Sequence, residues 1–221
     1  RDVVASDVNK KALEVAELLR GAKKPALVIG SQTLVNYTPA QAEALARAVE
    51  SIGIPTFLGG MARGLLGRDS DIQFRHKRSA ALKKADVVII AGFPFDFRLG
   101  YGQKINKKCT LVCANLGVRD LYKNRRPDVP VLGHPGDFLQ ALGAAMGGGR
   151  GDWDEWFGVV RGREEARDAE IVEQAKEVGD LINPVDFFLK LEEKLDDDSV
   201  LVVDGGDFVA TGAYTLKPRK P

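Results

Sequence analysis

Short runs of apolar residues alternate with amphipathic stretches along most of the sequence. The run at 86–91 is representative, because β-branched residues follow one another there without polar alternation and the run ends at Gly92. Such a run is typical of a parallel strand that is covered on both faces. The same reasoning predicts strands at 26–30, 54–58, 86–91, 110–114, 129–132 and 199–203.

Apolar residues spaced three and four apart lie between these runs. Val8, Ala12, Val15 and Leu19, for example, line one face of a predicted helix that ends at Gly21. Helices are predicted in this way at 8–21, 39–53, 75–85, 135–146 and 184–195. The alternation of strands and helices indicates the α/β class, with a three-layer, Rossmann-like, doubly wound parallel sheet.

The pattern changes after residue 146, where a glycine-rich break precedes a highly charged segment at 153–179. This segment is only weakly amphipathic, and Trp153, Trp156 and Phe157 are its expected apolar anchors. We interpret it as a linker packed on the surface. The predicted domains are a central domain at 1–148, a linker at 149–182 and the truncated beginning of a second α/β domain at 183–221, within a piece of a longer protein.

Charge and hydropathy exclude some functions. The 32 basic and 31 acidic residues nearly cancel, so no nucleic-acid footprint is expected. Two basic runs, at 104–108 and 123–126, are interpreted first as solvated loops and second as a rim for an anionic ligand. No apolar stretch approaches the roughly 18 to 20 residues that span a bilayer, so no membrane-spanning segment is predicted.

The cysteines and histidines do not form a recognisable site in the sequence. Cys109 and Cys113 flank an apolar run, and two cysteines with two distant histidines give neither a disulfide framework nor a zinc site. We therefore predict reduced, intracellular surroundings. His76, among arginines and lysines, is predicted to lie at the surface, and His134 before a proline is predicted to form a turn.

Glycine-containing turns follow four of the predicted strands, at Gly30, at 59–64, at Gly92 and at 133–137. Because the carboxyl ends of parallel strands meet at one edge of the sheet, these turns are predicted to converge at the edge where ligands bind. Converging glycine turns suit a nucleotide. None of them matches G-x-G-x-x-G, and glycine after a strand often serves only the turn, so both interpretations stay open with equal weight.

Charged residues near these turns are candidates for anion binding. Arg63 lies in a glycine loop, and Arg78 precedes a strand by one helix, so each is placed to reach an anion at the sheet edge. Asp96 and Arg98 form either a ligand clamp or, more simply, a local surface ion pair.

One set of motifs, spread over nearly the whole chain, occurs in the same order in a known enzyme family. The motifs are Pro25-Ala26-Leu27-Val28-Ile29-Gly30, Gly53-Ile54-Pro55, Met61-Ala62-Arg63-Gly64, Arg78-Ser79-Ala80, Ala85-Asp86-Val87-Val88 and Gly92. They resemble the central domain of thiamine-diphosphate enzymes, most closely the branch of acetolactate synthase, oxalyl-CoA decarboxylase and 2-hydroxyacyl-CoA lyase. The end of the chain resembles the entry into that family's C-terminal cofactor domain.

The resemblance implies a full-length enzyme that uses thiamine diphosphate and Mg²⁺, with no catalytic or metal-binding residue in this fragment. Gly206, Asp207 and Phe208 fall where relatives contact the diphosphate. In relatives the central domain holds FAD or ADP, and the corresponding nucleotide-like site here consists of Gly30, Ser31, Gly60, Arg63, Arg78, Gly92, Arg98 and Asn115.

Two departures from the family pattern affect that nucleotide-like site. Pro94 stands where relatives place an arginine, and Asn115 stands where they place an acidic residue that holds the ribose. A charged fork is thereby lost, and a charge-assisted hydrogen bond becomes a weaker neutral one. We therefore expect at most a weakened adenine-nucleotide or CoA site.

The resemblance further implies a lyase that cleaves 2-hydroxyacyl-CoA to formyl-CoA and a shortened aldehyde, with an acyl-CoA substrate, a homo-oligomeric state and a location in the endoplasmic reticulum reached through a part outside this chain. The fragment alone is expected to be inactive. Two alternatives stay open: acetolactate synthase-like condensation of 2-oxoacids, and a non-catalytic nucleotide-binding or assembly module.

Overall fold

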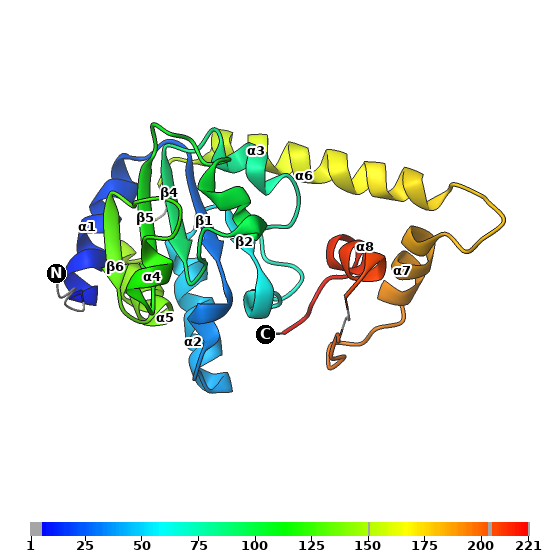
Figure 1. The fold of residues 1–221 in the computed structure, drawn as a ribbon, viewed down its shortest axis with the longest axis horizontal. Coiled ribbons are helices and arrows are strands. Elements are labelled where there is room, and N and C mark those ends of the chain that lie inside the picture. The colour runs from blue at the N-terminus through cyan, green and yellow to red at the C-terminus, as the bar shows by residue number, and fades with distance from the viewer. Residues whose placement is uncertain (1–5, 150, 203–204, 221) are drawn as a thin grey trace.

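A computed structural model describes residues 6–149, 151–202 and 205–220. Its centre is a parallel sheet with the strand order β3-β2-β1-β4-β5-β6, and Figure 1 shows β6 on the left and β2 on the right of this sheet. The strands are β1 (Pro25–Ile29), β2 (Thr56–Leu58), β3 (Gln73–Phe74), β4 (Val87–Ala91), β5 (Thr110–Asn115) and β6 (Val129–Leu132). The predicted doubly wound α/β fold is confirmed, and the two-residue strand β3 is an addition to the prediction.

The strand order reverses direction between β1 and β4. The chain first moves outward from β1 to β3, then crosses back to β4 beside β1, where Ile29 pairs with Ala91. In open sheets of this type ligands bind outside the carboxyl ends of the strands at such a reversal. The turns that follow Ile29 and Ala91 therefore define the place where a ligand site is expected.

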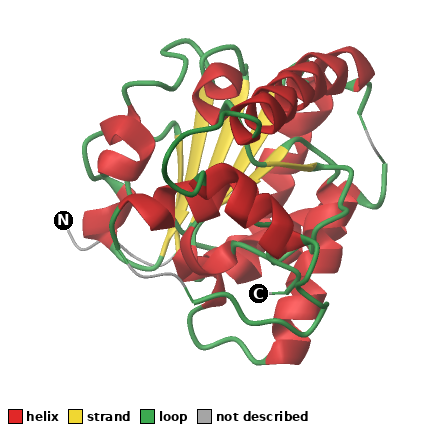
Figure 2. Ribbon diagram, turned by 90° about the vertical axis from the view of Figure 1, so that its right-hand side faces the viewer, coloured by secondary structure: helices red, strands yellow, loops and turns green. Residues whose placement is uncertain are grey.

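Helices cover the sheet (Figure 2). Those of the first 149 residues are α1 (Val8–Gly21), α2 (Pro39–Ile52), α3 (Arg78–Leu82), α4 (Val118–Leu121) and α5 (Pro135–Met146). Capping fixes the starts of α1 and α2: the Asp7 side chain accepts a hydrogen bond from the amide of Lys10, and Thr38 forms a capping box with Gln41. Helix α5 packs on both α1 and α2.

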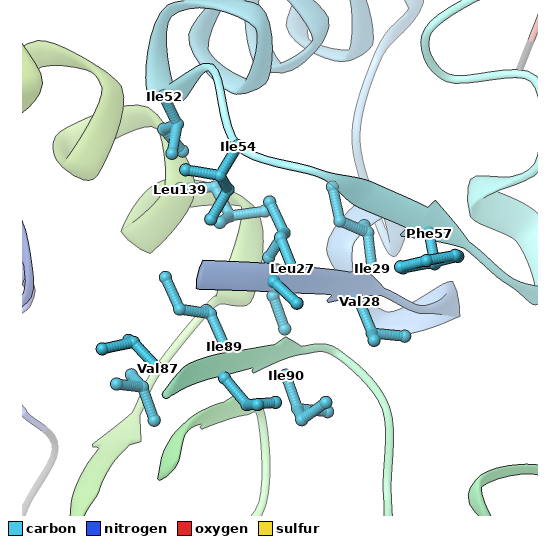
Figure 3. Close-up of a cluster of buried hydrophobic side chains, with 14 of the residues drawn as sticks. Leu27, Val28, Ile29, Ile52, Ile54, Phe57, Val87, Ile89, Ile90 and Leu139 are labelled. Atoms are coloured by element: carbon cyan, nitrogen blue, oxygen red, sulfur yellow. The ribbon is translucent and has the colours of Figure 1, made fainter. Parts of the chain in front are cut away.

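The core lies between the sheet and its helices. Every residue of β1 and of β4 is buried, which is why these strands show no polar alternation in the sequence. Figure 3 shows Leu27 and Ile89 from the two strands together with Ile54 and Leu139 from the surrounding segments. Burial of such aliphatic side chains contributes roughly 1.5–3 kcal/mol each.

Helix α3 is shorter than the predicted helix at 75–85. Lys77 has a φ of 53°, which is outside the right-handed helical region, so the helix begins only at Arg78. The amides of Arg75 and His76 instead donate to the two carboxylate oxygens of Glu164, at 2.9 and 2.8 Å. The side chain of Glu164, which is distant in the sequence, thus binds the two amides with which the predicted helix would have begun.

The predicted linker contains a long helix, α6 (Asp154–Ala175), which projects beyond the sheet (Figure 1). The predicted anchors are confirmed: Trp153, Trp156 and Phe157 are buried. The indole nitrogens of Trp153 and Trp156 donate to the carbonyl oxygens of Ala22 and Pro25, both at 2.9 Å. The first turns of α6 are therefore bound to the central domain.

Helix α7 (Pro184–Glu192) begins at the predicted cap, Asn183, and α8 (Asp207–Thr215) follows it. The predicted strand at 199–203 is wrong over 199–202, and Val203 lies outside the described residues. Strand hydrogen bonds need a neighbouring strand, and the described sheet contains none beside this segment. Val200 and Val202 consequently remain exposed.

Candidate functional site

The turns after β1, β2 and β4 meet at the carboxyl edge of the sheet, as the sequence predicts. The hydroxyl oxygen of Ser31 accepts a hydrogen bond from the amide of Met61 at 3.1 Å. The amide of Gln32 donates to the carbonyl oxygen of Gly92 at 3.2 Å. Gly30, Ser31, Gly60 and Gly92, all predicted site residues, therefore belong to one cluster.

Close backbone approach explains the glycines of this cluster. A Cβ atom at Gly30 would collide with the carbonyl oxygen of Gly92 and would lie 2.6 Å from Cδ2 of Phe93. Gly60 and Gly92 have φ values of 59° and 69°, a region that side chains other than glycine rarely adopt. A Cβ at Gly60 would in addition meet the hydroxyl of Ser31.

Phe93 is a residue of this edge that the sequence analysis did not single out. Phe93 is only 4% exposed. Its ring lies against the backbone of Gly30 and Gly59, where added Cβ atoms would come within 2.6 and 2.7 Å of it. The guanidinium carbons of Arg98 and Arg78 lie 4.8 and 6.0 Å from the ring centroid. Its local sequence carries no signal for this position, because the glycines that it contacts follow other strands.

Each predicted arginine has a partner within the chain. Nε of Arg98 lies 3.1 Å from both carboxylate oxygens of Asp96, so the local ion-pair interpretation of these two residues is confirmed. The hydrogen bonds between the two side chains lower the pKa of Asp96 and raise the pKa of Arg98. Nη2 of Arg78 donates to the carbonyl oxygen of Arg98 at 2.6 Å, and Nη1 of Arg63 to that of Ala213 at 3.2 Å.

Arg63 and Arg78 are partly buried cations. Burial lowers the pKa of both guanidinium groups, and the charge of Arg75 lowers that of Arg63 further, as the charge of Arg63 does for Arg78.

Asn115, a predicted site residue, is the last residue of β5 and so lies at the carboxyl edge of the sheet. Its side chain belongs to a residue that is 1% exposed, and its Oδ1 atom has no hydrogen-bond partner among the described residues. The Oδ1 atom is thus an acceptor that no donor of the described residues reaches.

The predicted diphosphate contacts lie in another part of the structure. Gly206 precedes α8 with a φ of 103°, and the ring of Phe208 packs edge-on against Phe188. The side chain of Asp207 is outside the described part of the chain. A cavity of about 760 Å³ separates α8 from the loop that holds Gly60 and Arg63.

His76 lies in the interior, so its predicted place at the surface is wrong. It is 7% exposed, and its Nε2 atom lies 3.2 Å from Oδ1 of Asp168 on α6. His76, Glu164 and Asp168 form a group close enough to hold a metal ion. Arg75, however, lies 3.8 Å from Glu164 and 3.3 Å from Asp168, so the carboxylates already have a cation.

The pH dependence of stability is a test of this interior position. Burial, aided by the charge of Arg75 and opposed by Glu164 and Asp168, lowers the pKa of His76 below its ordinary value of 6.5. Below about pH 6.5 the unfolded chain then binds more protons than the folded chain, so stability falls as the pH falls.

We expect the denaturation midpoint to drop between about pH 7.5 and about pH 5.5, and His76→Gln to reduce the drop. Denaturant titrations at both pH values measure this difference. An equally steep drop in the variant would assign the effect to another group.

His134 forms a turn, as predicted. Its Nδ1 atom accepts a hydrogen bond from the amide of Gly136 at 3.2 Å, and its Nε2 atom lies 2.9 Å from the carbonyl oxygen of Val35. These partners assign the proton to Nε2. Through the bond from Gly136, His134 caps the start of α5. Its ring also stacks on that of Tyr37, with the two ring centroids 4.6 Å apart.

The two cysteines take no part in the site. Both are free and buried, and burial raises the pKa of Cys113 well above its ordinary range. A buried, protonated thiol is a poor nucleophile and a poor metal ligand.

Within the described ranges, every helix is too short or too polar to cross a lipid bilayer.

Comparison with known protein families identifies the family of the central domain. Residues 13–142 match the family described as thiamine pyrophosphate enzyme, central domain. The chain belongs to this family.

Curated proteins with similar sequences fall in two groups. The chain is 44% identical over 210 residues to 2-hydroxyacyl-CoA lyase 2 of Mus musculus. This match covers 93% of this chain and 33% of the mouse protein. It is 41% identical over 222 residues to the protein of that name from Caenorhabditis elegans, covering 96% and 34%. Acetolactate synthase large subunit IlvG of Mycobacterium tuberculosis is 35% identical over 202 residues, covering 90% and 35%. The chain thus spans about a third of these relatives.

Proposed function

We propose that this chain is part of a thiamine-diphosphate-dependent lyase that cleaves 2-hydroxyacyl-CoA to formyl-CoA and an aldehyde one carbon shorter. The observation that carries the proposal is the 39–44% identity to relatives named 2-hydroxyacyl-CoA lyase 2, against 35% for the acetolactate synthases. Similar acetolactate synthases make 2-oxoacid condensation the second candidate. In the proposed reaction the bond between the thioester carbon and the hydroxyl-bearing carbon breaks, the hydroxyl loses a proton and the formyl carbon gains one.

Thiamine diphosphate, when bound, supplies the carbon nucleophile for this cleavage. The part of the chain proposed to bind it is the start of α8, where Gly206, Asp207 and Phe208 would contact the diphosphate. The first amides of a helix favour an anion, and α8 begins at Asp207. The central sheet would act as the scaffold that holds this segment, since Arg63 reaches the carbonyl oxygen of Ala213 on α8.

Other features of the whole protein are part of the same proposal. They are Mg²⁺ as the ion that accompanies the diphosphate, an acyl-CoA substrate, a homo-oligomeric state and a location in the endoplasmic reticulum. The isolated chain is proposed to be inactive, because the family resemblance assigns the group that activates the cofactor to a different domain. A non-catalytic assembly module is the remaining alternative.

Product analysis of the full-length protein tests the proposed reaction. With thiamine diphosphate and Mg²⁺ present, a 2-hydroxyacyl-CoA is expected to yield formyl-CoA and the shortened aldehyde in equal amounts, detected by mass spectrometry. The matched control omits thiamine diphosphate. Acetolactate from pyruvate without formyl-CoA would favour the synthase, and no product from either substrate would favour the module.

A further inference from the structure

We propose that the side chain of Phe93 is a built-in occupant of the ligand position at the strand-order reversal, and that this domain therefore folds without an adenine nucleotide there. The proposal concerns the carboxyl edge of β1 and β4 and does not depend on which reaction the whole protein catalyses. It assigns to Phe93 the place that an adenine or flavin ring would need.

The position of the ring is the first support. The turns after β1 and β4 enclose the reversal point, and Phe93 immediately follows Gly92 at the end of β4. Its ring contacts the backbone of Gly30 at the end of β1 and of Gly59 at the end of β2. A flat ligand approaching these bare glycines would collide with the phenyl ring.

The surroundings of the ring resemble those of a bound base. Glycine backbone covers one side, and the guanidinium group of Arg98 lies over the ring at 4.8 Å. A cation over an aromatic face is stabilising, more so when both are shielded from water. Asp96 holds Arg98 in this position through contacts to both carboxylate oxygens. The cation that could stack on an adenine is thus already stacked on Phe93.

The hydrogen-bond donors of the glycine turns are also used within the chain. The amides of Gly30 and Gly92 donate to the carbonyl oxygens of Ala91 and Ala114, both at 2.8 Å. The amide of Met61 donates to the Ser31 hydroxyl. A diphosphate would have to break these bonds, whereas anion-binding turns present free amides.

The experiment compares nucleotide binding by the full-length protein and by Phe93→Ala. Removal of a buried ring leaves an apolar cavity that a small aromatic ligand can fill. We expect no retained FAD and no saturable ADP binding for the wild type in gel filtration and calorimetry, and saturable ADP binding at least tenfold above the detection limit for Phe93→Ala.

Phe97→Ala is the matched control, because Phe97 also lies near Arg98, at 5.9 Å, but its side chain belongs to a residue that is 73% exposed. This variant should bind ADP no better than the wild type. Pro94→Arg tests the rival explanation that only an arginine is missing. A gain of ADP affinity in Pro94→Arg but not in Phe93→Ala would overturn the proposal.

Phe93→Leu provides a second, smaller change should Phe93→Ala not fold, and it is expected to gain ADP affinity in the same direction. Failure of both folded variants to gain affinity would overturn the proposal. The wild type provides a further test, because FAD that stays bound through its purification would show that the ring does not fill the position.

Discussion

Trp153→Ala is expected to lower the free energy of unfolding by about 4 kcal/mol, the range found for removal of a buried large aromatic side chain. Trp153 is 1% exposed and belongs to the core. Its loss removes apolar contacts and leaves the carbonyl oxygen of Ala22 without the indole donor. Denaturant titration measures the change in free energy, and limited proteolysis reports whether α6 detaches.

Trp153→Phe is the matched control for that variant. It keeps most of the buried ring and loses the indole hydrogen bond, so a cost of about 1 kcal/mol is expected. The two variants separate packing from hydrogen bonding. Equal effects of both would contradict the assignment of the larger contribution to packing, and no effect of either would mean that α6 is not anchored there.

Gly30→Ala is expected to destabilise the chain by about 3 kcal/mol, the upper range for overpacking. Gly30 has φ and ψ values of −119° and −178°, which any residue can adopt, so the cost is steric. The new methyl group would meet the carbonyl oxygen of Gly92 and the ring of Phe93. Neither can move without opening the junction of β1 with β4. Thermal or denaturant unfolding gives the magnitude.

Gly117→Ala is the control for Gly30→Ala, because Gly117 is also extended and an added methyl group there meets nothing within 4 Å. Its expected effect is within about 0.5 kcal/mol of neutral, because the reduced freedom of the unfolded chain is offset by the poorer cap that alanine makes at this N-cap position of α4. A loss of stability in Gly117→Ala as large as in Gly30→Ala would point to a general cost of replacing glycine and would contradict the steric explanation.

Local patterns predicted the sheet and most of its helices. The apolar run at 86–91 and the cap-plus-proline pair Thr38-Pro39 each specify their own element, because burial on both faces and satisfied helix ends leave direct traces in the sequence. The meeting of Gly30, Ser31, Gly60 and Gly92 followed from the same strands, since parallel strands bring their carboxyl ends together.

Features that depend on distant partners escaped prediction. Helix α6 has few apolar residues in its middle, and Glu164 and Asp168 there bind Arg75 and His76, so its polar face has partners that periodicity does not reveal. The same contacts bury His76. Phe93 was overlooked because its place depends on bare backbone at Gly30 and Gly59, which lie on other strands.

Helix α6 connects two packed regions, since its start is anchored by Trp156 and its far end contacts the last helices: Arg167 lies over the ring of Tyr214, and Asn183 donates to the carbonyl oxygen of Gln174. Each residue added to an α-helix rotates everything beyond it by about 100° and advances it by about 1.5 Å. The number of residues in α6 therefore determines how α7 and α8 are oriented relative to the sheet. Insertions or deletions of whole turns would preserve the facing of α7 and α8 toward the sheet, whereas a change of one or two residues would turn them away from it.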